Sequence, residues 1–135
     1  MKNIMLLFLS KLSLRGNLIG TKPIYDLGQG ELVETHTTNE SAVRYLLNHL
    51  PAEEKLDRLY IFASQNVQGK PRQIDEPGFE GEYNDLAYFI QRIVQFWPEA
   101  KESIQVENYN ENLQGQDAIG QIMDMSRDIQ AYGQQ

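Results

Sequence analysis

Two short, unbroken runs of apolar residues constrain this chain more than any other feature. Residues 4–9 read IMLLFL and residues 59–63 read LYIFA. Strands that are apolar on both faces are buried on both faces, which is typical of a parallel sheet covered by helices. A third stretch, residues 103–109, alternates Ile104, Val106 and Asn108, and it predicts a further strand nearer an edge of the sheet.

Three segments between and after these runs have the apolar spacing of amphipathic helices. They cover residues 40–50, 82–97 and 117–131. Pro51 and Pro98 follow the first two segments and should end both helices. Thr37 and Glu40 have the spacing of a capping box at the start of the first helix, and Asp117 is expected to cap the third.

The sequence Gly28-Gln29-Gly30 separates two short extended runs and predicts a β-hairpin with a glycine turn. This hairpin would lie in the first crossover, between the first strand and the first helix. The resulting order is strand, hairpin, helix, strand, helix, strand, helix. It predicts an α/β fold, a Rossmann-like three-layer sandwich with a mainly parallel sheet and the hairpin inserted in the first crossover. Residues 65–81 have no periodicity, and we expect a functional or mobile loop there.

The charge of the chain excludes some partners. Its formal net charge of −7 opposes binding to duplex nucleic acid, which needs a broad basic face. Positive charge nevertheless collects at the start, where Lys2, Lys11, Arg15 and Lys22 precede the first acidic residue, Asp26. No apolar run approaches the roughly 18 residues that a membrane span requires. We therefore expect a cytoplasmic protein that binds neither a membrane nor duplex nucleic acid.

Signals for catalysis are weak. The absence of cysteine excludes thiolate metal sites and cysteine nucleophiles, and it suits a reducing compartment. His36 and His49 do not have the spacing of metal ligands, and a Ser-His-Asp arrangement cannot be inferred from one sequence. The only GxG motif lies in the expected hairpin, and no glycine-lysine phosphate loop is present. We assign no catalytic residue, metal ligand or cofactor.

Polar residues follow the expected strands, whose carboxyl ends should meet at one edge of the sheet, where α/β folds bind ligands. Hydroxyls, amides and helix N-termini suit phosphate oxygens and base edges, and positive charges attract an anion. The candidate ligand-binding residues from these loops are Ser10, Lys11, Arg15, Thr38, Asn39, Ser64, Gln65, Asn66 and Asn110. Each such residue alone is more often an ordinary loop residue. Their coincidence at one edge carries the expectation of an anionic, nucleotide-like ligand.

The segments KNIMLLFLS, THTTNESAVRYLLNHL and LDRLYIFASQNV together resemble the amino-terminal half of CARF domains, the CRISPR-associated Rossmann-fold sensors. The resemblance implies a regulatory domain of type III CRISPR antiviral defence. Such a domain binds a cyclic oligoadenylate as a symmetric homodimer and switches on an attached effector. The ligand-binding residues that it implies are Ser10, Lys11, Ser64, Gln65 and Asn66. It also implies that the segment as far as Lys70 closes over the ligand.

Members of that family continue past the third helix into another strand and a segment containing Thr-Gly-Gly. Neither that segment nor an effector domain precedes Gln135. We therefore expect residues 1–135 to form a single CARF-like domain, the amino-terminal part of a longer protein. Two alternatives stay open. One is a ring nuclease, in which Ser10, Lys11 and Ser64 position the ligand's own 2′-hydroxyl for attack on its phosphate. The other is a small α/β interaction domain without a nucleotide.

Overall fold

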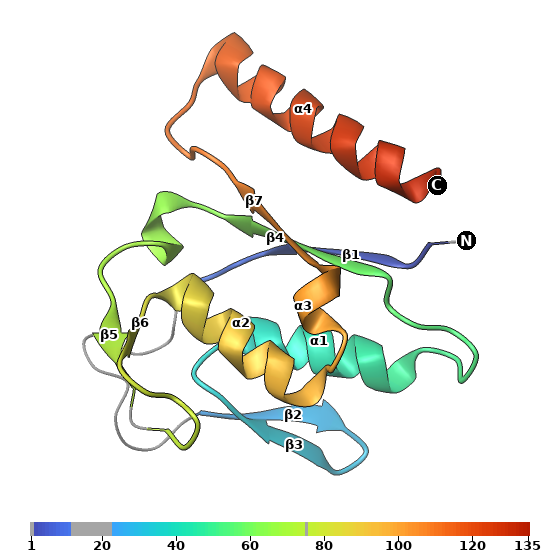
Figure 1. Ribbon diagram of the computed structural model, residues 1–135, viewed down its shortest axis with the longest axis vertical. Coiled ribbons are helices and arrows are strands. Elements are labelled where there is room, and N and C mark those ends of the chain that lie inside the picture. The colour runs from blue at the N-terminus through green and yellow to red at the C-terminus, as the bar shows by residue number, and fades with distance from the viewer. Residues whose placement is uncertain (1, 12–22, 75) are drawn as a thin grey trace.

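The central feature of the protein is a three-stranded parallel sheet (Figure 1). The computed structural model describes residues 2–11, 23–74 and 76–135. In sheet order the strands are β1 (Ile4–Phe8), β4 (Arg58–Ala63) and β7 (Ile104–Asn108). All three strands run in the same direction, so their carboxyl ends meet at one edge of the sheet. The expectation of an α/β chain built around a parallel sheet is confirmed.

Two helices, α1 (Thr38–His49) and α2 (Asp85–Phe96), cover one face of this sheet (Figure 1). Side chains alternate between the two faces of a strand, so every second strand residue points toward these helices. The main core therefore contains Leu7, Leu9, Leu59, Ile61 and Ala63 from the sheet, packed against Val43, Phe89 and Ile93 from the helices. Both helices were predicted from their apolar spacing, and both end before a proline, as expected.

The long helix α4 (Gly115–Gly133) lies on the opposite face of the sheet (Figure 1). Its carboxyl-terminal half packs Met125, Ile129 and Tyr132 against Tyr60 and Phe62 of β4. The ring centroid of Tyr132 also lies 3.6 Å from the Arg58 guanidinium carbon, an arrangement that adds cation–π attraction. None of the helices within the described residues is long and apolar enough to cross a membrane.

Two further strands lie in the part of the first crossover that the structure describes. β2 (Ile24–Gly28) and β3 (Glu31–Glu34) form a separate antiparallel pair between β1 and α1 in the chain. The turn between them has positive φ angles of 53° at Gln29 and 81° at Gly30, the backbone conformation that two-residue hairpin turns require.

The stretch after β4, expected as a loop without regular structure, contains more structure than its sequence indicates. It includes a short 3₁₀ helix, η1 (Gln65–Val67), and the antiparallel strands β5 (Arg72–Gln73) and β6 (Glu82–Tyr83). Ile74 and Phe79 from this stretch pack with Tyr88 of α2 in a small second core. Two-residue strands are too short to produce a periodic pattern, so the sequence did not reveal them. A short helix that was also not predicted, α3 (Ala100–Ser103), precedes β7.

The predictions of helix capping were wrong at two positions. Thr37 occupies the N-cap of α1 but makes no side-chain capping bond, and Glu40 pairs with arginines instead of the helix N-terminus. A buried guanidinium offers a carboxylate charged hydrogen bonds, which are stronger than a bond to a backbone amide. The N-cap of α4 is Gln114, and Asp117 lies within the first turn.

Candidate functional site

The carboxyl ends of β1 and β4 lie side by side. The register pairs Phe8 with Phe62, and Leu9 N donates to Phe62 O at 3.1 Å, which continues the ladder beyond the last strand residue. Ser10 and Ser64 each follow this pair by two residues. The two serines therefore leave the sheet on neighbouring strands at the same edge.

These two serines lie in different surroundings. Ser64 is buried, with 4% of its surface exposed, and its side chain makes no capping bond to η1. Ser10 is exposed, and its backbone N donates to Asn39 Oδ1 at 2.9 Å. Asn39 Nδ2 in turn donates to Phe8 O at 3.2 Å. The amide of Asn39 thus fastens the first turn of α1 to the end of β1 and brings the N-terminus of that helix to the same edge.

A hollow of about 690 Å³ opens at this edge, between the loops that follow β4 and β7. Its volume lies within the range of roughly 300–1,000 Å³ that is typical of ligand sites. Amide side chains dominate its lining, which consists of Gln65, Gln68, Asn108, Tyr109, Asn110, Asn112 and Gln121. Two candidate residues, Gln65 and Asn110, are therefore brought together here. The lining residues that the structure describes present amide donors and acceptors and no charged side chain.

Hydrogen bonds from α4 fix one wall of this hollow. Gln121 Oε1 accepts from Asn110 N at 2.8 Å, and Gln121 Nε2 donates to Asn110 O at 3.2 Å. The side chain of Asn110 also bonds within its own loop, where its Oδ1 accepts from Asn112 N at 2.9 Å. The loop after β7 is therefore held in one conformation by the helix that follows it.

The remaining candidates are distributed around the same edge. Asn66 Nδ2 donates to Glu111 Oε1 at 2.9 Å, a bond that joins the loop after β4 to the loop after β7. Thr38, the first residue of α1, and Lys11 are both exposed. Lys70 is exposed between η1 and β5 and does not line the hollow. Arg15 lies outside the described residues.

Sequence reasoning missed five residues that line the hollow. They are Gln68, Asn108, Tyr109, Asn112 and Gln121. The sequence NYNEN at 108–112 is rich in amides and could have indicated the first members of this set. Gln121 lies within α4, and the apolar spacing that predicts this helix does not indicate which of its glutamines lines a site. Only the fold brings Gln121 back to the loop before α4.

A second polar group lies inside the protein, away from this hollow. Arg92 bonds to both Glu40 and Glu76, and Tyr88 Oη donates to Glu76 Oε1 at 3.0 Å. Burial alone would lower the pKa of Arg92, but the hydrogen bonds and charges of Glu40 and Glu76 outweigh burial and raise that pKa. Burial, followed by the charge of Glu76, raises the pKa of Tyr88 above its ordinary value. These ionisable groups are bonded to one another in a buried network that connects α1, α2 and the stretch between β5 and β6.

Within the part of the chain that the structure describes, no group of three or more His, Cys, Asp or Glu side chains could hold a metal ion. No protein-family model, curated protein or solved structure matches this chain. The chemistry of the site follows from its own residues. It is a set of amides and hydroxyls at the carboxyl edge of a parallel sheet, with a helix N-terminus and Lys11 nearby.

Proposed function

We propose that this chain is a CARF-like, Rossmann-type sensor domain that binds a cyclic oligoadenylate at the carboxyl edge of its sheet. The observation that supports the proposal most directly is the amide-lined hollow at the edge where Ser10 and Ser64 lie side by side. Open α/β sheets bind ligands at this edge, and the sequence resemblance suggests the identity of the ligand.

The chemistry of the edge suits an adenylate. The hollow offers amide groups that both donate and accept, as the edge of an adenine requires. Phosphates would meet backbone N–H groups at the start of α1 and the ammonium of Lys11. A cyclic oligoadenylate carries only a few phosphates, so a few local donors suffice and the net charge of −7 does not prevent binding.

The proposal extends to assembly and biology. A cyclic oligoadenylate with an even number of units has two-fold symmetry, and a two-fold dimer would present the same hollow to each half of the ring. In this proposal the chain acts in the cytoplasm as part of an antiviral signalling protein, and ligand binding regulates an attached effector. The ligand would contact Ser10, Ser64, Gln65 and Asn110 of both protomers.

Thermal unfolding with cyclic tetra-adenylate, cyclic hexa-adenylate, linear tetra-adenylate and ATP tests the proposal. A specific ligand raises the melting temperature by mass action, by about 5–10 °C when its concentration exceeds Kd a hundredfold. Lys11→Glu should remove this rise without changing the unliganded melting temperature, because Lys11 is exposed. Lys101→Glu is the matched control, since exposed Lys101 in α3 lies at the opposite edge of the sheet.

The proposal fails if neither cyclic nucleotide raises the melting temperature of the folded wild-type protein. It also fails if linear tetra-adenylate or ATP is as effective as the cyclic compounds. Chromatography of the cyclic nucleotide after incubation distinguishes a sensor, which leaves the ring intact, from a ring nuclease, which opens it.

A further inference from the structure

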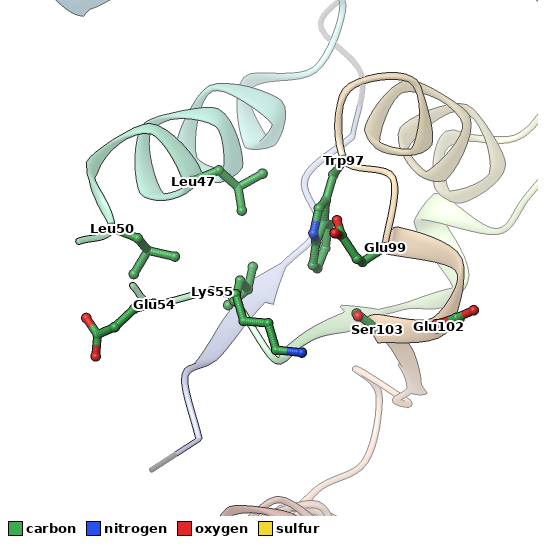
Figure 2. A pocket seen from close by; sticks show the side chains of 9 residues that line it. Leu47, Leu50, Glu54, Lys55, Trp97, Glu99, Glu102 and Ser103 are labelled. Atoms are coloured by element: carbon green, nitrogen blue, oxygen red, sulfur yellow. The ribbon is translucent and has the colours of Figure 1, made fainter. Parts of the chain in front are cut away.

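A second hollow, of about 250 Å³, lies at the other edge of the sheet, near the ends of α1 and α2. Its apolar wall is formed by Leu47, Leu50, Leu56 and Trp97. Figure 2 shows Leu47 and Leu50 on one side of the pocket and the ring of Trp97 on the other. We call this hollow the Trp97 pocket. It is far from the amide-lined hollow along the strand direction, because it adjoins the amino ends of β4 and β7.

Trp97 contributes an unused hydrogen-bond donor to the pocket. Only 5% of its surface is exposed, yet its indole N–H donates to none of the residues that the structure describes. Figure 2 shows the indole nitrogen on the edge of the ring that is turned toward Leu47. The N–H is not one of the fully buried donors without a partner, so it meets solvent in the pocket, and an incoming carbonyl oxygen can take the place of water as its acceptor.

The rim of the pocket is acidic. Glu54, Glu99 and Glu102 are exposed there, and none of their carboxylates pairs with another described residue. Among the described residues that line the pocket, Lys55 is the single cation, and its side chain extends across the pocket toward Ser103 (Figure 2). Three carboxylates against one ammonium leave the rim with a net negative charge. Such a rim attracts a positively charged partner.

We propose that the Trp97 pocket docks a peptide segment of a partner protein in which one large apolar side chain is flanked by Lys or Arg. The apolar side chain enters the pocket, a peptide carbonyl accepts from the Trp97 indole, and the basic side chains approach Glu99 and Glu102. The pocket is smaller than the roughly 300–1,000 Å³ of a small-molecule site, so it suits one side chain better than a cofactor. Interface hot spots have this form, an aromatic side chain in a desolvated pocket surrounded by a polar rim.

Charge argues for a basic partner and against a second copy of this chain. The chain itself carries a net charge of −7, so another copy would bring further negative charge to an acidic rim. This inference does not depend on the proposed function, because the two hollows lie at opposite edges of the sheet and share no residue.

The single tryptophan of the chain makes the test specific. The Trp97 indole gives one cross-peak in a ¹H–¹⁵N spectrum of the full chain, and its position reports on this pocket alone. The probe is the peptide acetyl-Gly-Lys-Phe-Lys-Gly-amide. Two comparison peptides replace either both lysines with glutamate or the phenylalanine with glycine. We expect the first peptide to shift the indole cross-peak with saturation, and both comparison peptides to bind at least about tenfold more weakly.

Two double variants distinguish the effect of the rim carboxylates from general attraction of the peptide to an acidic protein. Glu99→Gln with Glu102→Gln should weaken binding of the first peptide about three- to tenfold. The matched control, Glu53→Gln with Glu80→Gln, removes the same charge from exposed residues outside the pocket and should leave the affinity unchanged. The four residues are exposed, so all variants should fold.

Several results would overturn the proposal. They are the absence of an indole shift up to about 1 mM peptide, equal binding of the glutamate or glycine peptides, and equal loss of affinity in the two double variants. An indole cross-peak that shifts with protein concentration alone would mean that a second copy occupies the pocket, which also contradicts the proposal. Each of these results leaves the nucleotide proposal intact, because that proposal is measured by the response to cyclic oligoadenylate.

Discussion

Arg92 and Glu40 form a bidentate ion pair inside the protein. Arg92 Nε donates to Glu40 Oε1 at 2.6 Å, and Nη2 donates to Oε2 at 2.8 Å. The Glu40 side chain is fully buried, and that of Arg92 is 10% exposed. The same guanidinium also donates to Glu76 Oε2 at 2.9 Å and to Glu34 O at 3.0 Å. One side chain therefore joins α1, α2, β3 and the stretch between β5 and β6.

Replacement of this arginine should strongly destabilise the fold. Arg92→Met leaves the buried carboxylates of Glu40 and Glu76 without their main partner. Breaking a buried ion pair in this way costs about 3–5 kcal/mol. Urea unfolding followed by circular dichroism measures the loss. Arg127→Met is the control, because Arg127 is 72% exposed, lies 3.5 Å from Asp124, and should contribute less than about 1 kcal/mol. Similar unfolding midpoints for the two variants would contradict a structural role for the network.

Asn39→Ala should loosen the carboxyl edge before any ligand is present. The variant loses the bonds to Ser10 N and Phe8 O, and we expect about 1–2 kcal/mol less stability, because a typical hydrogen bond contributes about 1 kcal/mol. Amide hydrogen exchange at Ser10 should become faster. Thr38→Ala, at the exposed neighbouring position, should change stability by less than about 0.5 kcal/mol. Unchanged exchange at Ser10 would mean that Asn39 does not hold this edge and is free for a ligand.

The sequence was most informative about elements with a long or unbroken apolar pattern. Residues 4–9 and 59–63 predicted two strands of the sheet, and residues 82–97 predicted α2 within three residues at each end. The expectation of burial on both faces is met by β4 but was wrong for β1, an outer strand whose Leu6 and Phe8 are 53% and 60% exposed. These patterns are reliable because burial on a strand or a helix face repeats with a fixed period. The positions of Ser10 and Ser64 at one edge follow from the same patterns together with parallel pairing.

The polar network and the hollows were not predictable in the same way. The spacing of Glu40 from Thr37 predicted a capping residue. No local pattern indicated the actual partner, Arg92, because it lies 52 positions away in the sequence. The contact of Gln121 with Asn110 depends on where α4 crosses the sheet. The Trp97 pocket forms where α1, α2 and the segments before β4 and β7 come together. Each feature results from tertiary packing, which a local pattern does not encode.

The raised pKa of the buried Tyr88 phenol can be tested by absorbance spectroscopy. Burial and the negative charge of Glu76 raise the pKa of Tyr88, so this phenol should stay neutral through the range in which an ordinary tyrosine ionises, near pH 10. Tyr88→Phe should therefore leave the change in absorbance of the folded protein between about pH 9 and 11 almost unaltered. A clear loss of absorbance change in the variant would show that Tyr88 ionises normally.

The raised pKa of Tyr88 also determines how the stability of the folded protein depends on pH in the alkaline range. The pKa of Tyr88 is higher in the folded state than in the unfolded state, so the folded state holds this proton more tightly. The stability that Tyr88 contributes is present below about pH 10 and is lost as pH rises above it. Tyr88→Phe should cost about 1–2 kcal/mol at pH 7, through loss of the bond to Glu76, and the cost should shrink above pH 10. A cost that stays constant with pH would contradict this linkage.

A third hollow, between β7 and α4, is lined by both Glu107 and Asp128. Partial burial, followed by the charge of Asp128, raises the pKa of Glu107 above its ordinary value. The folded state therefore binds this proton more tightly than the unfolded state, and stability falls as pH rises through the raised pKa. Glu107→Gln removes the repulsion and should stabilise the protein at pH 7. The gain should be below about 1 kcal/mol, because solvent screens exposed charges.

This gain should have a defined dependence on pH. Below about pH 3 the Glu107 carboxyl is protonated in both states, so the difference between Glu107→Gln and wild type should vanish, and it should grow between about pH 3 and 7. Asp117→Asn removes a charge from the same hollow, but from the first turn of α4, where the helix dipole favours an anion. It should be neutral or slightly destabilising at pH 7. Equal stabilisation by both variants would indicate that total charge, and not the proximity of Glu107 to Asp128, determines the effect.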